Sequence, residues 1–203
     1  MSKKNKEYSE EKYIETSPIL TIENHKKIIN QMEKKICRII INNYSKGSGF
    51  FCKIPLVNRD FIGLVTCHHF LNKESIYANN IIIIELNNGE VKKEITIDES
   101  RVFYTKEEYD ITIVEIILDD KIDLSNCLEL DNKYYDIHNY ERIYEKQLVY
   151  VLHYPNGDEC LSSYGNLNVV QDSNEYKIYH YCSTKYGSSG SPIILLNNLK
   201  VIG

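Results

Sequence analysis

The sequence has no tryptophan, no Cys-x-x-Cys pair and no apolar run long enough to cross a membrane. A membrane-spanning helix needs about 20 consecutive apolar residues, whereas the longest aliphatic block, residues 81–84, is the length of a strand. The charged N-terminus, residues 1–12, lacks the apolar segment of a secretory signal. These absences predict a cytoplasmic chain that does not bind membranes.

An excess of basic residues is also absent. Lysine and arginine number 24 against 29 aspartates and glutamates, and the net charge is −5. The two signs are interleaved along the chain, which is typical of a solvated surface and predicts no nucleic-acid partner. Hydrophobic residues make up 42% of the 203 positions, enough for one large domain or two packed lobes with a real core.

The cysteines show no zinc-type spacing with histidine, so the sequence predicts no metal and no cofactor. In a chain without a secretory signal they are expected to be reduced core thiols, and a disulfide is the alternative. The six cysteines stand at positions 37, 52, 67, 127, 160 and 182.

Residues 1–36 are expected to form a polar tail and a short amphipathic helix. Apolar residues recur at helical intervals between about residues 21 and 35, with Glu23 and Asn24 as starting residues. From residue 37 onward the patterns are those of short strands separated by turns. Strands are predicted at residues 37–43, 49–54, 61–66, 80–86, 91–97, 101–104, 111–118, 147–153, 161–170, 175–182 and 191–196, and another begins at residue 200.

This series of strands predicts an all-β fold of two packed antiparallel barrels. The first barrel covers about residues 37–118 and the second about residues 146–203. The segment between them, about residues 119–145, is charged and rich in tyrosine, as suits a linker.

A turn of small residues at 187–192 precedes the last predicted strand and contains Ser189. Such a turn lets a serine hydroxyl stand clear of the backbone while nearby N–H groups converge on one point, which is what acyl transfer needs. By itself the pattern fits an ordinary tight turn equally well.

A serine nucleophile also needs a histidine base and a carboxylate that orients this base. His68 and His69 end a predicted strand, and Asp110 precedes a strongly apolar one. Each has an ordinary explanation, as a histidine at the end of a strand and an acid that faces water.

Together these segments resemble the chymotrypsin-like (trypsin-fold) serine peptidases, over about residues 37–203. The family's patterns are Gly-x-Gly-Phe, Thr-x-x-His, Asp before an apolar strand, and Gly-x-Ser-Gly-(Gly/Ser)-Pro. They occur in this order at residues 47–50, 66–69, 110–113 and 187–192. The last is most similar to the glutamyl-endopeptidase and heat-shock-protease branches.

The resemblance implies a serine endopeptidase that cleaves a peptide or protein substrate through an acyl-enzyme. His69 lies three residues after Thr66, which selects it over His68. By the resemblance, His69 is the general base and then the general acid, Asp110 orients its ring, and Ser189 is the nucleophile.

The resemblance further implies that the backbone N–H groups of Gly187 and Ser189 form the oxyanion hole. Ser183 and Thr184 would form the floor of the primary substrate pocket. Small hydroxyl residues there argue against cleavage after Arg or Lys and leave acidic or small residues, with acidic ones slightly favoured. His180 is interpreted as an ordinary strand histidine.

Three departures from the family leave alternatives open. Ser188 stands where the family usually has Asp or Asn, and Cys67 precedes His69, so it is not the family's histidine-loop cysteine. The sequence ends soon after Ser189, so the second barrel is expected to lack strands that complete the pocket in relatives. The alternatives are a weak or inactive peptidase-like module that binds peptides, a peptidase fragment, or another β-barrel whose triad is a coincidence. The sequence does not indicate an oligomeric state.

Overall fold

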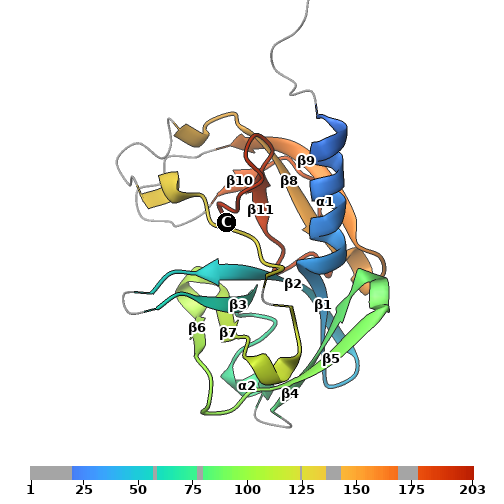
Figure 1. The fold of residues 1–203 in the computed structure, drawn as a ribbon, viewed down its shortest axis with the longest axis vertical. Coiled ribbons are helices and arrows are strands. Elements are labelled where there is room, and N and C mark those ends of the chain that lie inside the picture. The colour runs from blue at the N-terminus through green and yellow to red at the C-terminus, as the bar shows by residue number, and fades with distance from the viewer. Residues whose placement is uncertain (1–19, 57–58, 77–79, 124, 136–142, 169–177) are drawn as a thin grey trace, which may run out of the picture.

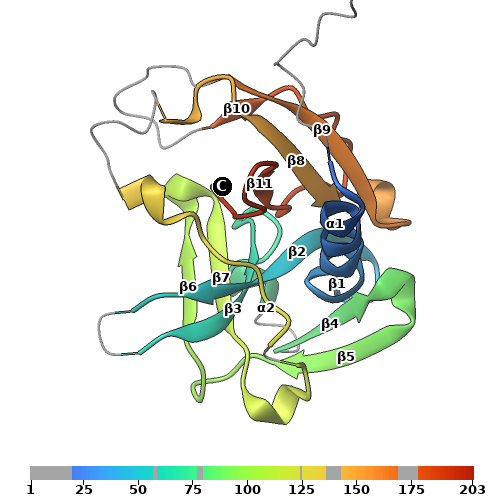
Figure 2. The ribbon, with the colours of Figure 1, turned by 45° about the horizontal axis from the view of Figure 1, so that its top comes forward.

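The fold was analysed in a computed structural model, which is mostly β with two antiparallel sheets and one long helix (Figures 1 and 2). The structure describes residues 20–56, 59–76, 80–123, 125–135, 143–168 and 178–203. Within these ranges, no helix combines the length and the apolar character that a membrane crossing requires.

The first sheet has seven strands in the order β5-β4-β1-β2-β3-β7-β6. Neighbouring strands are antiparallel throughout, and most are joined by short connections. The strands are β1 (Ile36–Ile41), β2 (Ser45–Ile54), β3 (Phe61–Thr66), β4 (Ile81–Leu86), β5 (Val91–Thr96), β6 (Phe103–Lys106) and β7 (Ile111–Glu115).

The second sheet has four strands in the order β10-β9-β8-β11. After β11 the chain turns back, and the Ile193 and Ile202 N–H groups donate to Gly203 and Ile193 carbonyls at 2.6 and 2.9 Å. The strands are β8 (Leu148–His153), β9 (Leu161–Asn168), β10 (Tyr179–His180) and β11 (Ile193–Leu195).

The hydrophobic core that joins the two sheets determines where the site lies. Phe50 of β2 and Val65 of β3 belong to the same buried cluster as Leu152 of β8 and Ile194 of β11. Apolar burial of this kind is the main favourable term in folding. It packs β2 and the end of β3 against β8 and β11. Three of the sequence motifs lie on or beside these strands, in β2, after the end of β3 and in the turn before β11.

The N-terminal helix α1 (Ile22–Lys34) is present as predicted, but it starts one to two residues earlier than Glu23 or Asn24. Thr21 caps it, because its hydroxyl accepts a hydrogen bond from the Asn24 N–H at 3.1 Å. The helix is tied to the second sheet where the Tyr150 hydroxyl donates to Gln31 Oε1 at 2.6 Å.

The predicted β architecture is confirmed, with differences in individual elements. The strand expected at residues 101–104 is β6, shifted by two residues, because Arg101 is buried in a bidentate ion pair with Asp120. Of the strand expected at 175–182, the structure shows β10, and residues 175–177 lie outside the described residues. The short helix α2 (Lys73–Ile76) was not predicted.

Candidate active site

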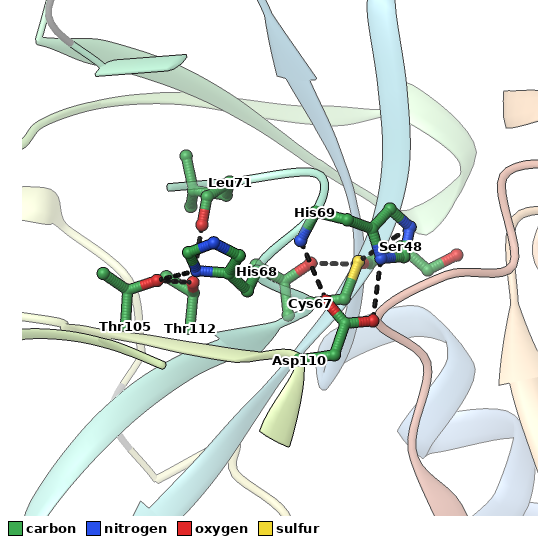
Figure 3. Close-up of polar contacts among 9 residues, drawn as sticks. Ser48, Cys67, His68, His69, Leu71, Thr105, Asp110 and Thr112 are labelled. Atoms are coloured by element: carbon green, nitrogen blue, oxygen red, sulfur yellow. Dashed lines mark hydrogen bonds and ion pairs between the residues drawn. The ribbon is translucent and has the colours of Figure 1, made fainter. Parts of the chain in front are cut away.

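His69 and Asp110 are joined by two hydrogen bonds (Figure 3). The Asp110 carboxylate accepts from the His69 backbone N–H at 2.9 Å and lies 2.7 Å from the ring Nδ1. A carboxylate at Nδ1 holds the proton there, so the neutral ring has its lone pair at Nε2. The pair is exposed, with 60% of the His69 side chain and 52% of the Asp110 side chain accessible to solvent.

The backbone of Asp110 is in the left-handed region, with φ +47°. It follows the single turn Glu107–Tyr109, and its N–H donates to the Glu107 carbonyl at 2.9 Å. A non-glycine residue in this region carries a conformational cost, and such residues cluster at functional sites. This turn places the carboxylate at the start of β7, opposite the end of β3 where the histidine stands.

His68 has different partners (Figure 3). Its Nδ1 lies 2.8 Å from the Thr105 hydroxyl on β6, which in turn lies 2.7 Å from the Thr112 hydroxyl on β7. The two adjacent histidines therefore point to different neighbours, and His69 is the one that meets Asp110.

The turn that carries Ser189 is held against the first sheet by Ser48 of β2. The Ser48 N–H donates to the Ser189 carbonyl at 3.1 Å, and its hydroxyl donates to the Gly187 carbonyl at 2.8 Å. The same hydroxyl accepts from the Tyr154 N–H at 2.9 Å, and the Ser48 carbonyl accepts from the Thr66 hydroxyl at 2.9 Å. One fully buried serine thus joins β2, β3, the end of β8 and the turn.

Two glycines make this close approach possible. Gly187 has φ +84°, and a Cβ there would lie 2.8 Å from the Tyr154 carbonyl oxygen. Gly190 has φ +85°, and its Cβ would overlap the Ser48 carbonyl and the Thr66 hydroxyl. Only glycine fits both the backbone conformation and the space.

Ser188, next to the predicted nucleophile, is buried and does not face solvent. Its hydroxyl lies 2.7 Å from Nδ1 of His153 and accepts from the Lys185 N–H at 3.0 Å. His153 is only 4% exposed, and this burial lowers its pKa from the ordinary value of 6.5. The neutral ring therefore predominates at pH 7, and its Nδ1 can accept a hydrogen bond from the Ser188 hydroxyl.

Ser189 itself is exposed. Among the described residues, its hydroxyl makes no hydrogen bond with His69, and the Gly187 and Ser189 backbone N–H groups donate to no other residue. The group nearest His69 Nε2 in a polar contact is the Cys67 thiol, at 3.6 Å (Figure 3). The structure thus brings together His69 and Asp110 and holds the Ser189 turn at the same edge, without a direct His69–Ser189 bond.

Comparison with known proteins identifies the family. Residues 47–203 match the model of the trypsin-like peptidase domain, which is more than half of the chain. The chain belongs to the trypsin-like peptidase family. No curated protein sequence matches it.

Solved structures of peptidases share the fold of this trypsin-like chain. The serine endoprotease from Yersinia pestis has a TM-score of 0.59 at 13% identity, over 92% of this chain and 57% of that one. The Rv3671c protease of M. tuberculosis, in an inactive form, has a TM-score of 0.56 at 18% identity, over 92% of this chain and 86% of that one. The HtrA-type protease AlgW, solved with a tripeptide, has a TM-score of 0.58 at 14% identity, over 88% of this chain and 52% of that one. The chain thus spans little more than half of two of these proteins.

The trypsin-like chain presents its predicted pocket residues on an exposed segment. Ser183 and Thr184 are both exposed, and the Ser183 N–H is held by the Ser163 hydroxyl of β9 at 2.7 Å. His180 accepts at Nδ1 from the Cys182 N–H at 3.2 Å, and burial lowers its pKa. His180 is therefore mainly neutral at pH 7 and supplies little positive charge to this segment.

Cys67 is buried at 6% exposure, and this burial raises the pKa of its thiol to about 11. At neutral pH it is a thiol and not the thiolate that acts as a nucleophile. The trypsin-like chain therefore does not offer Cys67 as an alternative attacking group at this site.

Sequence reasoning missed the roles of Ser48 and His153 in holding the turn that carries Ser189. Ser48 lies between Gly47 and Gly49 of the Gly-x-Gly-Phe pattern, and a small polar residue in a buried strand is the available signal. His153 ends a run of apolar residues on β8, where a buried polar side chain needs a partner. The partner, Ser188, is far away in sequence and could not be identified without the fold.

Proposed function

We propose that this chain is a serine endopeptidase that hydrolyses peptide bonds through an acyl-enzyme. The observation that carries the proposal is the two-bond contact between His69 and Asp110 at the edge where the Ser189 turn is fixed. Family membership supports the reaction class. The assignment of the individual roles is our proposal.

In this mechanism Asp110 keeps the proton of His69 on Nδ1, so that Nε2 is free to take the Ser189 proton. The deprotonated Oγ attacks the scissile carbonyl carbon, and the protonated ring then donates to the leaving amine. Water repeats the sequence on the acyl-enzyme and restores Ser189. Such a base contributes about 100- to 10,000-fold to the rate.

The carbonyl oxygen that becomes negative in this step needs donors. The Gly187 and Ser189 N–H groups have no partner among the described residues, whereas the Gly187 carbonyl is held by Ser48. Holding the carbonyl fixes the orientation of that part of the turn. We infer that the two free N–H groups form the oxyanion hole, where the loss of one donor costs about 100- to 1,000-fold in kcat.

The substrate class follows less directly from the exposed Ser183 and Thr184. Neither is hydrogen-bonded to a carboxylate among the described residues. Since a buried acid is what recognises Arg or Lys in trypsin-like pockets, we propose cleavage after small or acidic residues. His180, whose pKa is lowered by burial, is mainly neutral at pH 7 and would contribute little positive charge to bind an acidic side chain.

A fluorophosphonate probe tests the proposed function. The wild-type chain is expected to be labelled at Ser189, and Ser189→Ala to remain unlabelled. Ser191→Ala is the matched control, because its hydroxyl lies two residues away on the same turn, is buried and has no hydrogen-bond partner in the part of the chain that the structure describes. Absence of labelling in a folded wild-type sample would contradict the proposal.

A second function is favoured by one observation, the missing hydrogen bond between Ser189 and His69 in the described site. If Ser189 and His69 stayed apart when a peptide is bound, the chain would bind peptides at the same edge without cleaving them. Apo sites often tighten when substrate binds, which is why we rank the enzyme first. Peptide binding to an unlabelled, folded chain would establish this alternative.

A further inference from the structure

Arg38 of β1 joins the first sheet to the β8–β9 turn (residues 154–160). Its Nε and Nη2 donate to the Glu85 carboxylate on β4, at 2.8 Å for Nε, and the two side chains are only 15% and 13% exposed. Its Nη1 donates to the Gly157 and Asp158 carbonyls at 2.7 and 2.8 Å. The ion pair thus directs one rigid guanidinium plane at two backbone carbonyls of the turn. The proposed mechanism gives this arginine no role.

The β8–β9 turn lies directly against the peptide group that joins Tyr186 to Gly187. The Asn156 N–H donates to the Tyr186 carbonyl at 2.6 Å. A Cβ on Gly187 would lie 2.8 Å from the Tyr154 carbonyl oxygen and 3.0 Å from the Gly157 nitrogen. No side chain separates the two backbones at this point, so a shift of the β8–β9 turn acts on the peptide group of Gly187 directly.

This contact determines the direction of the Gly187 N–H. A trans peptide group is planar, and its C=O and N–H point in opposite directions. Because Asn156 holds the Tyr186 carbonyl on the side of the β8–β9 turn, the Gly187 N–H points away from that turn. It has no partner among the described residues, and it is one of the two proposed oxyanion donors. The hydrogen bond from Asn156 therefore orients a donor that the reaction needs.

The β8–β9 turn has a backbone that needs support from outside. Asn156 and Gly157 are both in the left-handed region, at φ +57° and +68°. For a residue other than glycine this conformation carries a cost, and it persists where the surrounding structure holds it. Arg38 binds the two carbonyls that follow Asn156. Where the β4–β5 turn lies beside it (Figure 1), Asn88 Oδ1 accepts from the Cys160 N–H at 2.8 Å. Of these two supports, Arg38 is the one that contacts the residues next to Asn156.

We propose that Arg38 is a positioning residue for the oxyanion hole. It holds the carbonyls after Asn156, the Asn156 N–H holds the Tyr186 carbonyl, and the Gly187 N–H is thereby presented to the substrate oxygen that becomes negative. Arg38 itself does not touch the substrate. Its effect on the reaction rate rests on the proposed peptidase function, whereas its hold on the β8–β9 turn does not.

Arg38→Lys is the variant that tests this role. Lysine keeps a positive charge for Glu85 but lacks the planar guanidinium that reaches a carboxylate and two carbonyls at once. Arg101→Lys is the matched control, because Arg101 is also buried, pairs with the Asp120 carboxylate and donates to a backbone carbonyl, that of Glu115 at 3.1 Å. None of these partners of Arg101 belongs to the second sheet or to the β8–β9 turn. Both variants lose a buried ion-pair geometry, and only one of them lies against the proposed oxyanion hole.

The hold on the turn is measured first, independently of activity. Hydrogen exchange of the Asn156 N–H is followed by NMR in the full chain and is compared with that of the β3 amides in the same sample. We expect exchange of this N–H to be about tenfold faster or more in Arg38→Lys, because local opening of the turn becomes easier, and unchanged in Arg101→Lys. Equal exchange in Arg38→Lys and the wild type would overturn the proposal.

The effect on catalysis is measured as kcat, KM and the pH profile with a peptide substrate. Interactions that form only in the transition state change kcat and leave KM nearly constant. We expect Arg38→Lys to lower kcat by about tenfold or more, below the roughly 100- to 1,000-fold cost of losing an oxyanion donor altogether. The pH at half-maximal kcat should stay the same, because the His69–Asp110 pair is not touched. An equal loss of kcat in Arg101→Lys, or a shifted pH profile, would contradict action through the Gly187 N–H.

The two measurements separate this proposal from the proposed function. If the wild type neither cleaves peptides nor is labelled, but Arg38→Lys frees the Asn156 N–H, the proposed function fails and the hold of Arg38 on the turn stands. If the wild type is active and Arg38→Lys keeps its kcat, the positioning role fails and the proposed function stands. Should Arg38→Lys not fold, Glu85→Gln takes its place, because it keeps the shape of the pair and weakens its grip on the guanidinium. Unchanged Asn156 exchange and unchanged kcat in Glu85→Gln would then overturn the proposal.

Discussion

The hydroxyl of Ser188 lies 2.7 Å from Nδ1 of His153, and both side chains are buried. Ser188 is the neighbour of the predicted nucleophile, and His153 is the last residue of β8. The contact therefore anchors the turn to the second sheet, as Ser48 anchors it to the first. In this chain a neutral hydrogen bond stands where the family resemblance leads one to expect a carboxylate or an amide.

His153→Ala should lower activity by loosening the turn. The change leaves the Ser188 hydroxyl without its acceptor, and an unpaired buried polar group costs about 1–3 kcal/mol. His153→Gln retains an amide oxygen that can accept the same proton, so we expect it to restore much of the activity. The measurement is kcat/KM together with urea unfolding of both variants. Equal activity of His153→Ala and the wild type would show that the anchor is not needed.

The same contact predicts a pH dependence of stability. Burial lowers the pKa of His153, so the unfolded chain takes up a proton near pH 6.5 while the folded chain resists it. The unfolded state then binds more protons, and stability falls as the pH drops below about 6.5, until the folded pKa is passed. Because His180 shifts in the same direction, the test is the difference between the wild type and His153→Gln. We expect the pH slope of the unfolding free energy to be smaller in His153→Gln, and identical slopes would contradict the assignment.

Ser48→Ala should destabilise the chain and impair catalysis together. It leaves the Gly187 carbonyl and the Tyr154 N–H without their side-chain partner at a buried position. We expect the free energy of unfolding to fall by about 2–6 kcal/mol, at about 1–3 kcal/mol for each of the two unpaired polar groups. Ser45→Ala, on the exposed part of the same strand, should change stability by less than about 0.5 kcal/mol. Urea unfolding measures the free energy of unfolding of both variants. A decrease in Ser48→Ala as small as that in Ser45→Ala would rule out the anchoring role.

The two adjacent histidines should behave differently. His69→Ala is expected to lower kcat by about 100-fold or more, because Nε2 is the proposed base. His68→Ala removes the contact with Thr105 on β6, so its effect should appear in stability and not in the chemical step. The measurement is kcat and the unfolding free energy for both variants. A larger loss of kcat in His68→Ala would show that the site is built on the other histidine.

Much of the fold could be predicted from the sequence because its strands are short, β-branched and separated by turn residues. The strand predicted at residues 61–66 is β3 itself, and Thr66, Cys67 and His69 follow from its end. The first and last residues of a strand could not be predicted where tertiary contacts determine them. Arg101 reads as the start of a strand, but its buried pairing with Asp120 takes it out of β6.

The site could be predicted only in part, for a similar reason. Residues that carry chemistry stand in recognisable local patterns, and His69 with Asp110 could be paired by family order. The contacts of Ser48 and His153 link segments more than 100 and about 35 residues apart, respectively. No local pattern encodes such contacts. The position of Cys67 against Nε2 likewise depends on how the chain turns at the end of β3.

Gly187→Ala should abolish most activity through geometry alone. At φ +84° an alanine carries the backbone cost of the left-handed region, about 1–2 kcal/mol, and its Cβ would lie 2.8 Å from the Tyr154 carbonyl. Gly89→Ala isolates the first effect, because Gly89 has φ +96° but its Cβ would meet nothing nearer than Arg38 at 3.6 Å.

Both variants should therefore lose a similar amount of unfolding free energy from the left-handed backbone conformation. Only Gly187→Ala should also shift the turn and its N–H groups. A displaced oxyanion donor is expected to lower kcat by about 100-fold. Fluorophosphonate labelling rates and kcat, measured beside thermal unfolding, distinguish the two effects. If Gly187→Ala and Gly89→Ala lost activity equally, the loss would follow from general destabilisation, and the Gly187 N–H would have no special place in the reaction.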